Sequence, residues 1–270
     1  MPELPEIRNL SVQLACEMSG RKIVGTEVRQ EKCLNVPTAE FERLVIGRTV
    51  GKATSRGKWI FIPLLEDTLF LLSLGMGGDI LLHGAGDALP DKFQVKFEFE
   101  DHGCLTIAFW WFGYAHAVPT AEKSGHAVTA TLGIDPLNPD EFSYEAFEGL
   151  LEGKKSRIKT VLTDQKSIAG IGNVYIQDIL FRAGLHPDRK TSDISENERR
   201  LLHSVIVENL SSATRLGGLA YERDLHGSPG RFSDFLVGYQ EGKPCPSCGT
   251  TIIKIKTGST ASFICPSCQK

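Results

Sequence analysis

The chain has 270 residues, of which 41% are hydrophobic and 23% charged, and its formal net charge is −3. That composition is ordinary for a soluble globular protein, and no apolar run approaches the roughly 18 residues that suggest a membrane span. A negative net charge argues against a nucleic-acid partner unless positive charge is gathered locally. The N-terminus has no signal-peptide pattern, so we expect a cytoplasmic protein, nucleoid-associated if its source is bacterial.

The first six residues, Met1 to Glu6, place a proline directly after the methionine. Removal of Met1 exposes the secondary α-amine of Pro2, which is far less basic than a lysine amine and is therefore partly unprotonated at neutral pH. Such an amine attacks carbonyl and sugar carbons to form Schiff bases. The adjacent Glu3 can transfer protons for it. The alternative is an ordinary N-terminal segment with two prolines.

Residues 5–20 are expected to form a helix, because apolar residues recur there at spacings of three and four. Pro5 suits the first turn and Gly20 the C-terminal cap. The Pro2 amine would then lie at the N-terminal end of a helix, where the helix dipole favours a phosphate or Glu3 nearby.

From Lys22 to Ala130 the chain becomes a series of short apolar or alternating runs separated by Gly, Asp and Pro. Many short strands with turn residues between them predict a two-sheet β-sandwich. The expected strands are 23–28, 59–63, 68–74, 80–82, 92–100, 104–109 and 114–118.

A proline-rich linker follows at residues 134–140, and the pattern then becomes helical. Ser195 precedes Glu198 at the spacing of a capping box, which marks the start of the longest helix. The expected helices are 143–151, 155–163, 172–183 and 195–214, and the expected domains are 1–133 (β-sandwich), 141–243 (helical) and 244–270 (a cysteine-bearing end). The fold class predicted is α+β.

The strongest local signal is the pair of motifs Cys245-Pro-Ser-Cys248 and Cys265-Pro-Ser-Cys268. Four thiolates at this spacing predict a closed tetrahedral Zn²⁺ site on a β-hairpin. Because every coordination position is filled, the zinc would be structural, one per chain. Lys256 lies on this hairpin and suits phosphate contact, although a solvated basic face is equally consistent with it.

A second signal is the Gly170-Ile-Gly-Asn173 turn between two helical patterns, which suggests a helix–turn–helix-like unit. Backbone N–H groups there and the Asn173 amide can hold a phosphate, whereas the plain alternative is a glycine-capped helix hairpin. Residues 154–190 hold eight Lys or Arg residues, Lys155 among them, against three Asp, a local charge of +5. The positive charge that DNA binding requires is therefore local.

Together these parts resemble the formamidopyrimidine-DNA glycosylase/endonuclease VIII family over essentially the whole chain. The matching stretches are Pro2-Glu-Leu-Pro-Glu6, Arg56-Gly-Lys58, Leu74-Gly-Met-Gly-Gly78, Asp164-Gln165 through Tyr175, and the terminal zinc finger ending at Gln269. The resemblance implies a monomeric bifunctional DNA glycosylase and abasic-site lyase of base excision repair that acts on damaged double-stranded DNA without membrane partners.

The resemblance also implies roles for single residues. Pro2 would attack C1′ and Glu3 would transfer protons, with Glu6 in support near the site. Lys58 and Asn173 would bind phosphate. Met76 would fill the gap left by the flipped nucleotide, next to Trp111 and Phe112 of the intercalation loop.

Three departures from the family pattern stand out. Trp110 and Trp111 stand where the intercalation loop usually has arginines, Thr260 replaces the zinc-finger arginine, and Ser73 replaces a histidine. Tryptophan stacks on a base but cannot copy the hydrogen-bonding fork of arginine, so we expect no strict preference for cytosine opposite the lesion.

The segment 217–230 also departs from the family pattern, and Tyr221, Arg223 and His226 within it are candidates for touching a flipped base. Two alternatives remain at this point: a damaged-DNA-binding protein of the same fold with little glycosylase activity, and an RNA-binding or scaffold zinc-ribbon protein.

Overall fold

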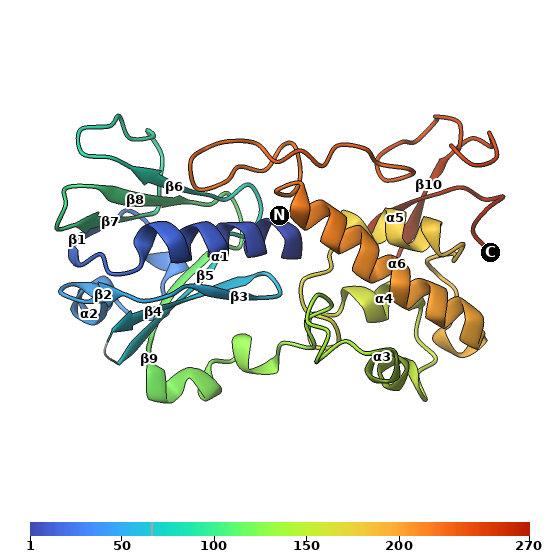
Figure 1. Ribbon diagram of the computed structural model, residues 1–270, viewed down its shortest axis with the longest axis horizontal. Coiled ribbons are helices and arrows are strands. Elements are labelled where there is room, and N and C mark those ends of the chain that lie inside the picture. The colour runs from blue at the N-terminus through green and yellow to red at the C-terminus, as the bar shows by residue number, and fades with distance from the viewer. Residues whose placement is uncertain (66) are drawn as a thin grey trace. The chain divides into compact units, whose positions relative to one another are not determined.

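The computed structural model describes residues 1–65 and 67–270. The chain forms two compact units (Figure 1). The first combines Met1–Thr131 with Leu216–Phe232, and the second combines Leu132–Arg215 with Ser233–Lys270. Residues 216–232 follow the last helix in sequence but make their contacts with the N-terminal part of the chain.

The first unit contains two antiparallel sheets, which confirms the predicted sandwich. One sheet has the strand order β1 (Ile23–Val28), β7 (Val95–Phe99), β8 (Cys104–Ala108) and β6 (Asp79–His83). The other has the order β2 (Thr49–Val50), β4 (Trp59–Leu65), β5 (Thr68–Ser73) and β9 (Tyr114–Pro119), with β3 (Thr54–Arg56) also paired to β4.

Helix α1 (Leu4–Met18) supplies one side of the core of this unit (Figure 1). Its apolar residues Ile7, Leu10 and Leu14 are buried in the same cluster as the inward side chains of both sheets. The alternating burial of β7, in which Val95, Phe97 and Phe99 point inward, follows from the two-residue period of a strand.

The sequence pattern did not predict helix α2 (Thr38–Val45). The helix begins after Pro37 and buries only Phe41 and Val45, and two apolar positions are too few to define a helical period. Short 3₁₀ turns complete the unit at η1 (Glu31–Cys33), η2 (Thr120–Gly125) and η3 (Thr129–Thr131).

The second unit is helical and carries a terminal β-hairpin, as the sequence indicated. Its helices are α3 (Tyr144–Leu151), α4 (Ile158–Thr163), α5 (Tyr175–Arg182) and α6 (Glu196–Arg215), with the 3₁₀ turn η4 (Thr191–Asp193). Ser195 and Glu198 form the expected capping box of α6, with the Ser195 N–H donating to Glu198 Oε2 at 2.8 Å. The hairpin pairs β10 (Ile253–Thr257) with β11 (Thr260–Ile264).

Buried polar groups hold this hairpin to the helices. The Lys159 ammonium on α4 donates to Thr260 Oγ1 (3.0 Å), the Ala261 carbonyl (2.8 Å) and Ser262 Oγ (2.8 Å). Gln177 on α5 accepts from the backbone N–H of Phe263 at 3.0 Å. All three ammonium protons of Lys159 are therefore satisfied although the side chain is buried.

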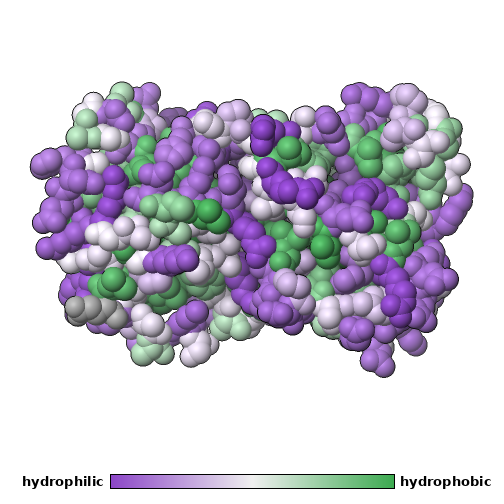
Figure 2. Space-filling view, viewed as in Figure 1, coloured by the Kyte–Doolittle hydropathy of each residue, from purple (hydrophilic) through white to green (hydrophobic). Residues whose placement is uncertain are grey.

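Hydrophilic residues cover much of the face shown in Figure 2, with apolar residues scattered among them. Within residues 1–65 and 67–270, no helix combines the length and the apolar character that crossing a membrane requires.

Candidate active site

The N-terminal end of α1 is organised by two buried carboxylates. Glu3 is the N-cap and Glu6 the third residue of the helix, and together they form a capping box. Glu3 is 2% exposed and Glu6 is 3% exposed. Glu6 Oε2 accepts the backbone N–H of Glu3 at 2.8 Å. Pro5 suits this first turn because it has no N–H to leave unpaired. The sequence that fixes the helix start thus also fixes the position of Pro2.

The same Glu6 carboxylate holds a second segment beside the N-terminus. Its Oε1 accepts the backbone N–H of Leu219 at 2.9 Å. We call residues 216–232 the strap. Gly218 on the strap has φ +88°, and a Cβ there would lie 2.5 Å from Glu6 Oε1. Both the backbone conformation and the close approach therefore require glycine at this position.

The strap is anchored in the core of the first unit rather than lying loosely on its surface. Leu225 is fully buried in the main apolar cluster, and its carbonyl accepts the N–H of Leu82 at 2.9 Å. The Gln13 side chain on α1 donates to Asp224 (3.0 Å) and accepts the N–H of Leu225 (3.0 Å). These contacts consequently hold the strap in place beside the N-terminus.

The three strap residues singled out in the sequence have different environments. Tyr221 is 61% exposed. Arg223 lies 3.8 Å from a carboxylate oxygen of Asp79, and His226 lies 3.5 Å from Glu17 on α1. Arg223 and His226 thus each face an acidic group of their own unit.

Sequence reasoning missed Glu222, which lies between two of these candidates. Its Oε1 is 3.4 Å from the α-amino nitrogen of Met1, and its side chain is 11% exposed. Burial raises the pKa of Glu222 above that of an ordinary carboxyl, with Asp79 and Glu3 adding to the rise and the N-terminal ammonium opposing it. A single glutamate within a polar loop forms no pattern that would mark it.

Lys58 and Met76 lie on turns of the β-sandwich. Lys58 is half-buried in the tight turn that joins β3 to β4. Met76 is 43% exposed between β5 and β6. The backbone N–H of Met76 donates to the Trp111 carbonyl at 2.9 Å, and the Trp110 N–H donates back to Met76 at 3.2 Å. Met76 and Trp111 therefore lie side by side, although they belong to different loops.

We call Met76 and residues 110–112 the aromatic wedge. Trp110, Trp111 and Phe112 are 81%, 64% and 67% exposed, so neither tryptophan belongs to the core. Phe112 has φ +57°, an uncommon value for a bulky residue. The fold thus holds three large aromatic side chains in solvent, where each could stack on a flat partner.

The base of the wedge is tightly fixed. The Gln94 side chain accepts the N–H of Phe109 (2.7 Å) and donates to its carbonyl (3.1 Å). Gly75 has φ +58°, and a Cβ there would lie 2.2 Å from the Trp111 carbonyl oxygen. The two loops therefore pack backbone against backbone, which is why Gly75 cannot be replaced without moving Trp111.

Asn173 lies in the second unit, in the turn just before α5. The Gln177 amide donates to the Asn173 carbonyl (2.8 Å) and to its side-chain oxygen (3.2 Å). The Gln165 side chain accepts the N–H of Gly170 (2.9 Å) and donates to the Ile171 carbonyl (2.8 Å). These amides brace the turn at the N-terminal end of α5, a position suited to an anion.

Several basic residues of the second unit already have partners within that unit. Arg157, Arg182 and Arg189 pair with acidic side chains, and Lys159 is used to dock the hairpin. Lys155 and Lys256 are exposed. The local charge of +5 therefore overstates what is available to a partner.

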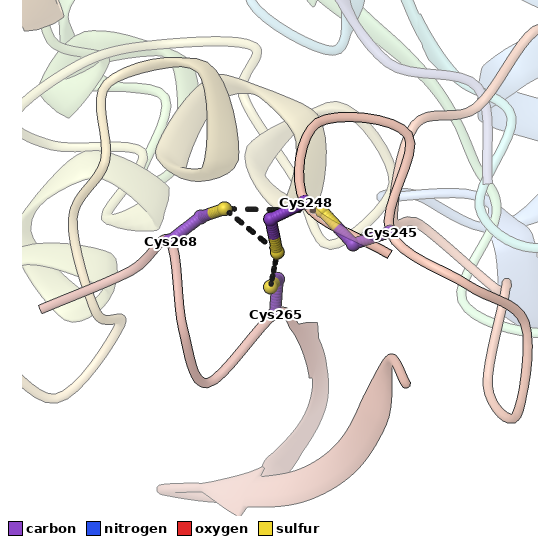
Figure 3. A group of neighbouring side chains, drawn as sticks. All are labelled: Cys245, Cys248, Cys265 and Cys268. Atoms are coloured by element: carbon purple, nitrogen blue, oxygen red, sulfur yellow. Dashed lines mark hydrogen bonds between the residues drawn. The ribbon is translucent and has the colours of Figure 1, made fainter. Parts of the chain in front are cut away.

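The four cysteines come together in a geometry that fits a metal ion (Figure 3). Their sulfurs lie within 4.8 Å of one another, with pairs at 3.4, 3.5 and 3.9 Å. A Zn–S bond of about 2.3 Å implies a tetrahedral S···S edge of roughly 3.8 Å. Cys245 and Cys248 come from the loop before β10, whereas Cys265 and Cys268 follow β11. This is a closed, structural zinc site, as the sequence predicted.

Comparisons with known proteins agree with these features. The formamidopyrimidine-DNA glycosylase N-terminal domain matches residues 1–108, the H2TH domain of the same enzymes matches 132–223, and the zinc finger found in FPG and IleRS matches 242–270. The formamidopyrimidine-DNA glycosylase of Cytobacillus firmus is 31% identical over 275 residues, covering 100% of both chains. That of Pelotomaculum thermopropionicum is 33% identical over 275 residues, covering 100% of this chain and 99% of its own.

Solved structures show the same fold. Lactococcus lactis Fpg in complex with DNA containing N7-benzyl-Fapy-dG is 29% identical and superposes with a TM-score of 0.92, covering 100% of both chains. The same protein bound to abasic-site DNA is 28% identical, with a TM-score of 0.91 and 99% coverage of each chain. The chain therefore belongs to the formamidopyrimidine-DNA glycosylase/endonuclease VIII family of DNA glycosylases.

Proposed function

We propose that this protein is a bifunctional DNA glycosylase and abasic-site lyase that uses the N-terminal amine of Pro2, freed by removal of Met1. The amine forms a bond to C1′ of a damaged nucleotide as the C1′–base bond breaks, and the bonding electron pair leaves with the base, which takes up a proton. Opening of the sugar ring gives an iminium. The iminium acidifies the C2′ proton, so β-elimination and then δ-elimination cut the strand.

One observation carries the proposal: the start of α1, where Glu3 and Glu6 are buried beside the N-terminus and Glu6 ties the backbone of Glu3 to the strap. A binding protein gains nothing from two desolvated carboxylates at a chain terminus, because burying charge costs free energy. An enzyme that must place an amine and move protons needs both. We assign proton transfer to Glu3 and positioning to Glu6.

The remaining site residues are proposed as DNA contacts. Lys58, Asn173, Lys155 and Lys256 bind phosphates, supported by their turn positions or their exposure. Met76, Trp111 and Phe112 enter the base stack where the damaged nucleotide is flipped out, supported by their exposure on fixed loops. The partner is damaged double-stranded DNA, bound by a monomer. Related Lactococcus lactis structures hold abasic-site DNA and Fapy-dG DNA.

We propose a matching division of labour along the chain. Residues 1–133 carry catalysis, residues 134–140 join the parts, and residues 141–243 and 244–270 bind DNA. The strap, although it lies within 141–243, contributes to catalysis through its hold on the N-terminus.

A second candidate function is damage binding with little excision. The aromatic wedge favours it, because exposed tryptophans recognise unstacked DNA without any chemistry. The buried Glu3 and Glu6 favour the enzyme.

Borohydride trapping on abasic-site DNA separates the two functions. Borohydride reduces the iminium to a stable amine, so the enzyme becomes covalently joined to DNA. We expect an adduct with the wild-type protein and none with Pro2→Gly at short reaction times, with duplex binding retained by both. Duplex binding without any wild-type adduct would contradict the glycosylase/lyase proposal and favour the binding protein.

A further inference from the structure

We infer that Glu222 on the strap exchanges protons with the N-terminal amine, acting as a shuttle during Schiff-base formation. This inference rests on the proposed function, because it adds a proton-handling group to the same site. Glu222 lies outside the sequence motifs named above and outside the N-terminal segment.

Backbone hydrogen bonds of the strap fix the position of Glu222. Glu6 holds the N–H of Leu219 and the N–H of Glu3 with its two carboxylate oxygens. The chain then turns, with the N–H of Glu222 donating to the Leu219 carbonyl at 3.1 Å and the N–H of Gly230 donating to the Glu222 carbonyl at 3.1 Å. These bonds bring Glu222 to the N-terminus.

The distance to the amine is short. Glu222 Oε1 lies 3.4 Å from the Met1 nitrogen. By standard backbone bond lengths, the nitrogen of Pro2 is at most about 3.7 Å further along the chain. After removal of Met1, the Pro2 amine is therefore at most roughly 7 Å from the carboxylate, a gap that a chain of two hydrogen-bonded waters spans and that a rotamer change of Glu222 shortens. A proton can pass over that separation.

The charges around Glu222 suit proton exchange. The Met1 amine faces it from the chain terminus, Asp79 from β6 and Glu3 from the cap of α1. The neighbouring Arg223 pairs with Asp79 at 3.8 Å. Burial raises the pKa of Glu222, which brings the carboxyl closer to neutrality, where a general acid–base group works best.

The proton balance is complete without any other reagent. As the amine nitrogen bonds to the aldehyde carbon of an abasic site, its proton passes to the Glu222 carboxylate and the aldehyde oxygen becomes a hydroxyl by taking up a solvent proton. Glu222 then returns a proton to that hydroxyl, which leaves as water while the nitrogen lone pair forms the iminium. Glu222 ends as the carboxylate in which it began.

The test compares Glu222→Gln with Glu222→Asp and with the control Glu17→Gln. Glu17 is an exposed α1 carboxylate that meets the strap at His226 and not at the amine, so the control loses the same charge. The rate of the borohydride-trapped adduct with abasic-site duplex is followed between about pH 5 and 9 under single-turnover conditions. Melting temperatures check that all variants fold.

We expect Glu222→Gln to slow trapping about 10- to 100-fold, which is below the 10²- to 10⁴-fold usual for acid–base groups because water can partly substitute. Glu222→Asp should recover most of the rate. Protonation of the amine should lower the rate toward acid in every variant. The wild-type rate should show an additional fall as the Glu222 carboxylate is protonated, beginning above the usual carboxyl range because burial raises the pKa, and Glu222→Gln should lack this additional fall. Rates of Glu222→Gln equal to those of Glu17→Gln at every pH would overturn the inference.

A second measurement separates this inference from the proposed function. Reductive methylation of the N-terminal amine by formaldehyde and cyanoborohydride forms the same kind of iminium without DNA. Slower methylation in Glu222→Gln supports the shuttle even if no DNA adduct forms with the wild type. Equal methylation in Glu222→Gln and Glu17→Gln overturns it.

Discussion

The acidic N-terminal site and the aromatic wedge belong to the same unit but are built in opposite ways. At the N-terminus, Glu3 and Glu6 are almost fully buried, and Glu6 hydrogen-bonds two separate backbone segments. In the wedge, Trp110, Trp111 and Phe112 expose most of their surface. Only the backbone beneath them is fixed, by Gln94 and by glycine contacts.

The difference explains which part of the site can change. A buried carboxylate with two backbone partners cannot be replaced without leaving donors unpaired, which costs about 1–3 kcal/mol for each group. The exposed side chains of the wedge hold no such buried backbone groups, so their identity can change without leaving a buried donor unpaired. Under the proposed function, the fold therefore constrains the residues assigned to bond breaking more than those assigned to contacts with the opposite base.

The largest expected effect breaks the N-terminal site itself. Glu3→Gln keeps the shape of the cap but removes its proton-transfer ability, so excision of a damaged base should fall about 10²- to 10⁴-fold. Single-turnover base release measures this, with the exposed Glu100→Gln as the control. A loss below five-fold would show that Glu3 only caps α1.

A second prediction compares a buried lysine with an exposed lysine of the second unit by the stability lost when each is replaced. Lys159→Met leaves the Ala261 carbonyl and two hydroxyls without their shared donor, and should cost about 2–4 kcal/mol of unfolding free energy. Zinc release to a chelator should also be faster, because the hairpin carries the zinc ligands. The exposed Lys155→Met should change stability by less than about 0.5 kcal/mol. Equal stabilities in urea would remove Lys159 from its docking role.

A third effect tests the wedge. Trp111→Ala should weaken binding to abasic-site duplex by about 1–3 kcal/mol, the contribution of one stacking contact, and by the same amount whichever base is opposite. Leu89→Ala, which truncates an exposed apolar residue elsewhere in the unit, should have no effect. Equilibrium binding measures both. A loss that depends on the opposite base would mean that Trp111 recognises base identity.

The smallest effect is a pH dependence of stability outside the site. His116 Nδ1 lies 2.9 Å from His126 Nε2, and burial, with a smaller contribution from His126, lowers the pKa of His116 from 6.5 to about 4. Between these values the unfolded chain binds the proton and the folded chain does not, so stability falls as the pH drops. We expect His116→Gln to reduce this slope, by about 1–2 kcal/mol over the interval. Identical slopes in urea titrations would contradict the assignment.

Periodic and motif-bearing parts of this structure could be predicted from the sequence. The strand Ile23–Val28 and the zinc ligands coincide with the expected residues, because strand alternation and paired Cys-x-x-Cys spacing are local signals. Helix α2 escaped prediction, because its sequence buries only two apolar residues. Local pattern thus predicts an element only when enough of its residues face the core.

The strap shows what sequence alone could not reveal. Its place beside the N-terminus depends on Leu225 entering a core formed by residues far away in the chain and on Glu6 bonding to Leu219 across 213 positions. The local sequence pattern of the strap carries no information about contacts with such distant residues. Glu222 could therefore be recognised only after the fold had brought it to the amine.

We propose that this chain retains the bond-breaking chemistry and has lost specific recognition of the base opposite the lesion. The most direct test measures single-turnover excision of one lesion, Fapy-dG, placed opposite each of the four bases. If the tryptophans stack without hydrogen-bonding the opposite base, the four excision rates should agree within about three-fold. A preference for cytosine of more than about ten-fold, equivalent to about 1.4 kcal/mol of discrimination, would contradict this proposal.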